Sequence, residues 1–158
     1  MRFRAMKFRS VLIMILGLTC TVAANAATLT KDPLTGLPID PATDPSHFGN
    51  EPVKIPDSQI CKSKMQANFY TIVDSKIDAT VAWYAAHLPG FHKSYQYVDN
   101  RPQDKFYNDA GTMMVLVLGQ IGKDGESVKT YSVTYYSFQP GLPAKASASF
   151  GQHKMACQ

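Results

Sequence analysis

The amino-acid sequence predicts an α+β fold, in which one helix packs on a mostly antiparallel sheet of four to five strands in the order β-α-β-β-β. Three observations predict it. A helical pattern with a start and a stop runs from Asp74 to Phe91. Alternating or fully apolar segments typical of strands surround it. Turn-forming residues separate these segments and allow neighbouring strands to pair antiparallel.

The helix has identifiable ends. Ser75 is the expected N-cap, and Asp78 takes the place of the usual Glu or Gln of a capping box. Pro89 and Gly90 end the helix, because Pro interrupts the hydrogen-bond ladder and Gly accepts a left-handed turn. Apolar residues recur on one side at helical spacing. This stripe consists of Ile77, Val81, Tyr84, Ala85 and Leu88.

Five segments are expected to form strands. Thr112–Leu118 is uninterruptedly apolar and is therefore the expected central strand, covered on both faces. Past Gln139 the pattern is lost, and the tail is expected to be irregular or a short edge strand. The other expected strands are Ile60–Val73, Phe91–Val98, Lys105–Asn108 and Ser127–Phe138, with turns at 99–104, 109–111 and 122–125.

Residues 1–26 have the pattern of a cleaved secretory signal peptide. A basic start is followed by an apolar run of 14 residues, Val11 to Ala24, and by the small-x-small site Ala24-Asn25-Ala26. This run is shorter than the ~20 residues that cross a bilayer as a helix. We therefore expect export to the periplasm or the medium, with no membrane span after cleavage. Lipid anchoring at Cys20 is not favoured, because the residues before it do not fit a lipoprotein signal.

The mature chain is electrically neutral. The signal contains four of the 16 Lys and Arg residues and none of the 12 Asp and Glu residues, which leaves 12 of each sign. Nucleic acid is therefore not expected as a partner. Residues 27–56 are rich in proline and are expected to be a solvated linker, and residues 57–158 a single α+β domain. Asp32, Asp40 and Asp44 lack the spacing of a calcium loop.

Two cysteines remain after processing, Cys61 and Cys157. In an oxidising compartment they are expected to form a disulfide that ties the tail to the start of the first strand. The alternatives are two free thiols or a bridge to another chain.

Local motifs for catalysis are missing from the sequence. It contains no GxSxG or SxxK pattern and no phosphate-binding glycine loop. His87 and His92 lie five residues apart but have no third ligand nearby, and an ordinary structural role explains them better. We expect no metal and no cofactor, and the sequence favours a protein without enzymatic activity.

Tyrosines on the expected strands are the candidate contact residues: Tyr95, Tyr97, Tyr131 and Tyr135. They suit a recognition surface, although cross-strand stacking within the sheet is the simpler explanation. One helix covers one face of the sheet. Either the tail tethered at Cys157 covers the other face, or that face is offered to a partner or a second copy.

The preferred hypothesis is an exported, non-enzymatic module that binds a protein, a peptide or a small apolar ligand through an aromatic sheet face. The alternatives are a small secreted hydrolase-like enzyme without local motifs and a structural envelope protein.

Overall fold

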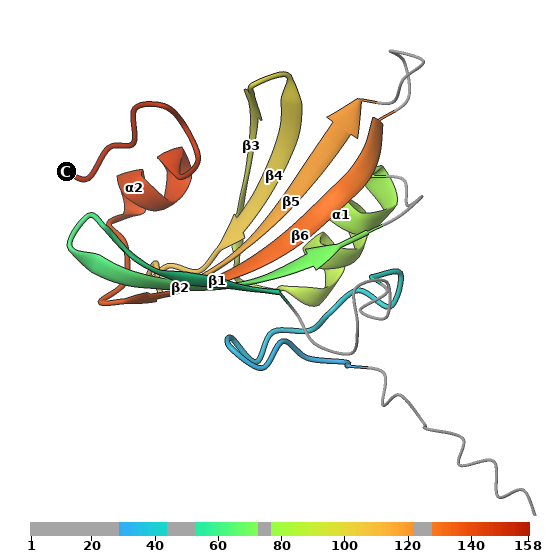
Figure 1. Ribbon diagram of the computed structural model, residues 1–158, viewed down its shortest axis with the longest axis horizontal. Helices are drawn as coiled ribbons and strands as arrows, with labels where there is room; N and C mark the ends of the chain where they lie inside the picture. The colour runs from blue at the N-terminus through green and yellow to red at the C-terminus, as the bar shows by residue number, and fades with distance from the viewer. Residues whose placement is uncertain (1–28, 44–52, 73–76, 122–127) are drawn as a thin grey trace, which may run out of the picture.

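The computed structural model describes residues 29–43, 53–72, 77–121 and 128–158, and it shows a curved antiparallel sheet with a helix on each face (Figure 1). The sheet has six strands in the order β1-β2-β6-β5-β4-β3. The elements are β1 (Val53–Ile60), β2 (Ser63–Thr71), α1 (Ile77–His87), β3 (His92–Val98), β4 (Arg101–Tyr107), β5 (Met113–Ile121), β6 (Val128–Gln139) and α2 (Ala144–Ser149). The two sides of the sheet are called the α1 face and the α2 face below.

The α+β class and the antiparallel pairing are confirmed, but the number of strands was predicted too low. The expected first strand, Ile60–Val73, corresponds to β2. The strand β1, which begins at Val53 within the expected linker, was not predicted, and it pairs with β2 in a hairpin that turns at Cys61 and Lys62, both with positive φ. The expected turn at 99–104 is only two residues long, Asp99 and Asn100, so that β4 begins at Arg101. Turn-forming residues hid the start of β4 at 101–104, and the prolines of the expected linker hid β1.

The strand predicted to be central is an inner strand. β5 pairs with β4 on one side and with β6 on the other. Val115 and Val117 point to the α1 face and Met114 to the α2 face, and all three are buried. Both faces of the sheet therefore need a cover.

On the α1 face, α1 packs against β4, β5 and β6. The predicted stripe is confirmed at Ile77, Val81, Tyr84 and Leu88, which are buried. Ala85 is exposed, and Thr80 is buried in its place. The expected N-cap Ser75 and the turn at 122–125 lie outside the described residues.

The N-terminal segment 29–43 also covers the α1 face, contrary to the expectation of a solvated linker. Ile39 is buried in the same apolar cluster as the α1 side chains, and Leu29 and Leu37 pack against it. A bridge between Lys31 and Pro38 closes the segment into a tight loop. Residues 44–52 of the expected linker lie outside the described part of the chain.

Asp32 attaches this segment to the sheet. One oxygen of its buried carboxylate accepts hydrogen bonds from the backbone N–H and the hydroxyl of Thr35, at 2.8 and 2.7 Å. The other accepts from Asn68 Nδ2 at 2.7 Å and from the Tyr70 hydroxyl at 2.8 Å. A buried carboxylate is tolerated here because its lone pairs meet donors from both the loop and β2.

The α2 face is covered by the C-terminal tail, which forms α2 where an irregular segment or edge strand was expected. The expectation of a single helix is thereby corrected, and the alternative that the tail covers the second face is confirmed. The buried residues under this cover are Met65, Ala67, Met114, Tyr136, Phe138, Leu142, Ala146 and Phe150. The predicted disulfide between Cys61 and Cys157 holds the end of the tail to the β1–β2 turn.

The tail enters this face through a close backbone crossing. The N–H of Leu142 donates to the carbonyl of Gly111 at 2.8 Å. A Cβ atom at Gly111 would lie 2.0 Å from the Leu142 carbonyl oxygen, and Gly111 has a φ of +62°. Glycine at this turn therefore permits the contact.

Within the described ranges, no helix has the length and apolarity that crossing a membrane requires. The expected signal peptide, residues 1–26, lies outside these ranges.

The disulfide is predicted to stabilise the fold because it closes a loop with a sequence separation of 96. Replacing both cysteines (C61S/C157S) should lower the free energy of unfolding by about 2–5 kcal/mol. Chemical denaturation of the variant and of the oxidised and reduced wild type measures this. Equal midpoints for all three samples would contradict the prediction.

The Asp32 contacts make a second prediction about stability. Asp32→Ala should lower the free energy of unfolding by about 1–3 kcal/mol, because the donors of Asn68 and Tyr70 lose their acceptor in a buried place. Lys31→Ala, a change in the exposed neighbouring residue, is the matched control and should have little effect. The same denaturation experiment compares the two variants.

Candidate functional site

The structure separates the four candidate tyrosines. Tyr95 and Tyr97 on β3 are 62% and 54% exposed. Tyr131 on β6 is 41% exposed, and the guanidinium of Arg101 lies 5.8 Å from its ring centroid. Tyr135 is completely buried, so the structure corrects its proposed role as a surface contact. Only Tyr95 and Tyr97 form a neighbouring pair among the four.

Tyr95 and Tyr97 lie on the α1 face, at the side of the sheet where α1 does not reach. Tyr95 is opposite Asp104 on β4, and Asp104 is opposite Val117 in the core beneath α1. Residues directly opposite each other share a face. Lys93, two positions before Tyr95, is on the same face and forms an ion pair with Asp104 at 3.2 Å. The pair of tyrosines is thus a surface beside the packed core.

In the part of the chain that the structure describes, β3 is an edge strand with no strand on its outer side. The turn at Asp99 and Asn100 has φ values of +51° and +59°, as a two-residue type I′ turn requires. Val98 and Arg101 flank such a turn as a hydrogen-bonded pair, and hydrogen-bonded and non-hydrogen-bonded pairs alternate from there. Pro102 fits this pattern, because it has no N–H to donate and falls at a non-hydrogen-bonded position. The backbone N–H and C=O groups of β3 that point away from β4 are therefore those of Lys93, Tyr95 and Tyr97.

The opposite edge of the sheet is less suitable for pairing. The β1 ladder is irregular between Ile55 and Ser58, and this interval contains Pro56, which has no backbone N–H. Asp57 pairs with Lys64 across the hairpin at 2.8 Å. A bulge, a proline and charged side chains are the devices that discourage pairing at an edge. β3 therefore offers the more regular edge of the two.

Tyr135 belongs to a buried polar network under the N-terminal segment. Its hydroxyl donates to the Pro38 carbonyl at 2.9 Å and lies 2.5 Å from the Tyr84 hydroxyl. The Tyr70 ring meets the Tyr135 ring edge-on at 5.4 Å. Burial raises the pKa of Tyr84 to about 12 and also raises the pKa of Tyr70 and of Tyr135. These hydroxyls stay protonated and act as structural hydrogen-bonding groups.

The histidines considered as metal ligands have separate partners. His87 contacts the Trp83 carbonyl through Nδ1 at 2.8 Å and stacks on the Trp83 ring. His92 pairs through Nε2 with Asp109. The described ranges contain no group of three or more His, Cys, Asp or Glu residues that could bind a metal ion.

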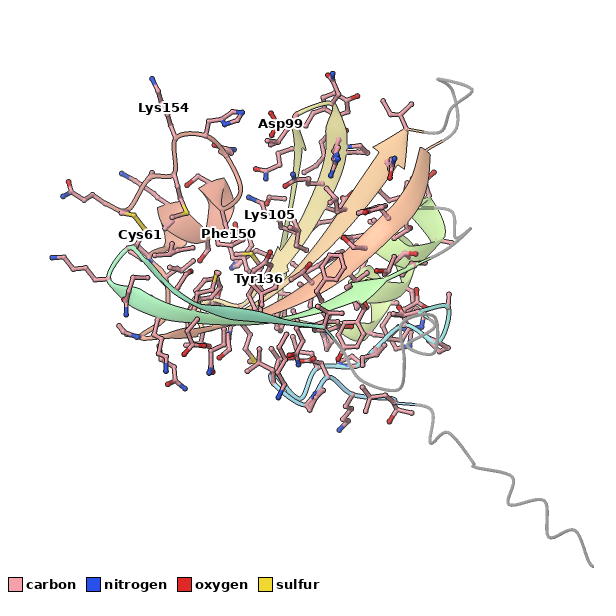
Figure 2. All side chains as sticks on the ribbon, viewed as in Figure 1. Cys61, Asp99, Lys105, Tyr136, Phe150 and Lys154 are labelled. Carbon is pink, nitrogen blue, oxygen red and sulfur yellow. A yellow bond between two sulfur atoms is a disulfide. The ribbon has the colours of Figure 1, made fainter. Side chains whose placement is uncertain are left out.

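Lys105 on β4 is a buried cation that sequence reasoning missed. Figure 2 shows it with Phe150 between the sheet and the tail. Its ammonium donates to Gln96 Oε1 at 3.1 Å and to the carbonyls of Ala148 and Phe150 at 2.5 and 2.8 Å. These bonds use all three N–H groups, and burial lowers the pKa of Lys105 to about 8. The side chain is 0% exposed, so it holds the tail and does not face a substrate.

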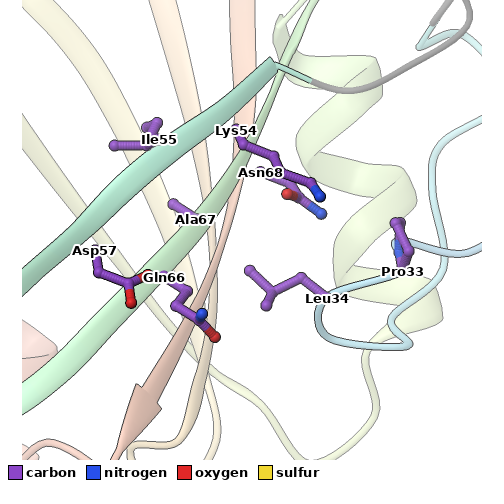
Figure 3. Close-up of a pocket in the computed structure, with 8 residues that line it drawn as sticks. All are labelled: Pro33, Leu34, Lys54, Ile55, Asp57, Gln66, Ala67 and Asn68. Atoms are coloured by element: carbon purple, nitrogen blue, oxygen red, sulfur yellow. The ribbon is translucent and has the colours of Figure 1, made fainter.

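A hollow of about 260 Å³ lies between the N-terminal loop and the β1–β2 hairpin (Figure 3). Two of its polar side chains already have partners. Asn68 donates to Asp32, and the hydrogen bond from Lys64 lowers the pKa of Asp57. Leu34 points into the space. The hollow is lined by Pro33, Leu34, Lys54, Ile55, Asp57, Gln66, Ala67 and Asn68. This lining contains no nucleophile next to a base.

Comparison with known proteins gives no match, whether to a protein-family model, to a curated protein or to a solved structure.

Two features of the site were hidden in the sequence for different reasons. The open edge of β3 depends on the order of strands in the sheet, which spacing alone does not give. Lys105 sits among turn-forming residues and was expected to be an ordinary strand start. In an extended strand Lys105 lies on the face of Gln103 and opposite to the face of Phe106. This pattern was the only available signal, and it was weak.

The burial of Lys105 predicts a pH dependence of stability. Between pH 8 and the ordinary lysine pKa of 10.5, the unfolded chain binds this proton more often than the folded protein does. Lys105 should therefore increase the free energy of unfolding as the pH rises from 8 to 10. This increase should be absent in Lys105→Met.

Chemical denaturation of both proteins at several values from pH 7 to pH 10 measures the difference. The series stops at pH 10 because unfolded tyrosines ionise above it, whereas Tyr84 keeps its proton to about 12. Parallel pH profiles for the wild type and the variant would show that the ammonium is not desolvated.

Proposed function

We propose that this protein is an exported, non-enzymatic binding module that accepts an extended protein or peptide segment along the β3 edge. The observation that supports it is the coincidence of open backbone groups and exposed tyrosines on one strand. Lys93, Tyr95 and Tyr97 point their N–H and C=O groups outward, and both tyrosines are more than half exposed. Strand addition at an edge combines main-chain hydrogen bonds with side-chain contacts of this kind.

The tyrosines supply the side-chain part of the binding. Each has a large apolar ring and a polar hydroxyl, and tyrosine is enriched at protein interfaces for this reason. Tyr95 and Tyr97 are neighbours on one face of β3, so an added strand would meet both rings at successive positions of that face. The rigid sheet behind them lowers the entropic cost of binding.

Export is part of the proposal. The signal pattern of residues 1–26 supports it, and the Cys61–Cys157 disulfide is compatible with an oxidising compartment. An uncovered sheet face is not available for binding, because the tail covers the α2 face.

A displayed library of random linear peptides, selected on the disulfide-bonded protein, tests this function. Selected peptides should bind Tyr95→Ala/Tyr97→Ala about tenfold more weakly than the wild type. Tyr131→Ala removes an exposed tyrosine elsewhere on the sheet and is the matched control, which should bind normally. Failure to enrich any peptide, or equal binding by the double variant, would refute the proposal.

A second comparison tests whether the backbone takes part. Tyr95→Pro and Tyr95→Ala both remove the ring, but only the proline also removes the outward N–H. The ladder to β4 should survive, because Tyr95 is at a non-hydrogen-bonded position. The proline variant should bind the selected peptides about three- to tenfold more weakly than the alanine variant. Equal affinities would show that the edge is not extended by a strand.

A further inference from the structure

We infer that the segment that pairs with β3 is β3 of a second copy, in an antiparallel two-fold arrangement centred on Gln96. This inference rests on the proposed function and names its partner. It follows from two properties of the strand: which backbone groups are free and where the tyrosines stand.

The backbone pattern permits this register. In an antiparallel pair centred on Gln96, Tyr95 lies opposite the partner's Tyr97, and Tyr97 opposite the partner's Tyr95. Both residues have outward N–H and C=O groups, so each opposition is a hydrogen-bonded pair. The two oppositions are equivalent by symmetry, as an isologous interface requires.

The side chains are complementary to themselves in this register. The four tyrosines of the two copies form two cross-strand pairs on the α1 face, and cross-strand aromatic pairs stabilise sheets. On the α2 face, the side chain of Gln96 donates to the Phe150 carbonyl at 2.9 Å and is buried under the tail. The contact is therefore made by the backbone edge and by the α1 face.

The charges along β3 do not oppose this pairing. A lysine on an edge strand normally opposes pairing, and in this register the backbone of Lys93 comes opposite that of the partner's Asp99. Their side chains lie on different faces, because Lys93 pairs with Asp104 on the α1 face at 3.2 Å and Asp99 pairs with His153 of the tail at 3.2 Å. The charge of Lys93 is therefore balanced within its own copy and does not repel the partner's strand.

The expected mature chain has no net charge, because the residues that follow the signal include 12 basic and 12 acidic ones. Two copies therefore approach without net repulsion. The contact is confined to one strand of seven residues, and so a weak dimer in exchange with monomer is expected.

Sedimentation equilibrium of the mature, disulfide-bonded protein over a range of concentrations tests the inference. The wild type should show a monomer–dimer equilibrium. Tyr95→Ala/Tyr97→Ala should weaken the dimer roughly tenfold, because it removes both cross-strand aromatic pairs. Tyr95→Pro should weaken it at least as much, because each copy also loses an outward N–H. Tyr131→Ala removes an exposed tyrosine elsewhere on the sheet and is the control, which should leave the dimer intact.

The outcomes separate this inference from the proposed function. A wild type that stays monomeric while selected peptides bind at Tyr95 and Tyr97 would overturn the dimer and keep the binding function. A dimer that tolerates Tyr95→Pro or Tyr95→Ala/Tyr97→Ala would overturn the proposed pairing. Thermal unfolding of each variant shows whether it is folded, and an unfolded variant is replaced by Tyr95→Ala or Tyr97→Ala alone, each expected to weaken the dimer by a smaller factor.

Discussion

The inner strands β5 and β6 are apolar on both faces, and this constraint determines the layers of the molecule. A sheet that is apolar on one face needs one cover, but Val115 and Met114 point in opposite directions and both are buried. The fold meets this need with two covers of different kinds. The helix α1 and the N-terminal loop shield one face, and the short helix α2 with the tail shields the other.

Both covers are small, and each is held by a buried charged side chain. Asp32 fastens the N-terminal loop through donors on β2, and Lys105 fastens the tail through carbonyls at the end of α2. Burying a charge costs free energy unless hydrogen bonds replace the lost water. Asp32 accepts four such bonds and Lys105 donates three, so both charges are compensated by geometry that only the native packing provides. The disulfide adds a covalent tie at the end of the tail.

Because both faces are covered, the proposed recognition surface lies at the edge of the sheet. The two outer strands differ in a way that matters for binding. β1 contains an irregularity and Pro56, whereas β3 is regular and carries Tyr95 and Tyr97 beyond the reach of α1. A surface that joins a free backbone to exposed rings suits an extended partner better than a compact ligand. Tyr135 differs from the other candidate tyrosines because it lies under the N-terminal loop and is part of the core.

The local features could be predicted from the residues alone. These were the helix with its buried stripe, the inner position of Thr112–Leu118 and the disulfide between Cys61 and Cys157, because periodicity, apolarity and an expected oxidising compartment act through nearby residues or through a single pair. Which tyrosines are exposed and how the second face is covered depend on the packing of distant segments. Tyr95 and Tyr135 look alike in the sequence, and their difference arises from strand order. The tail forms a helix although its small polar residues have no clear period, because the apolar α2 face supplies the contacts that its own sequence lacks.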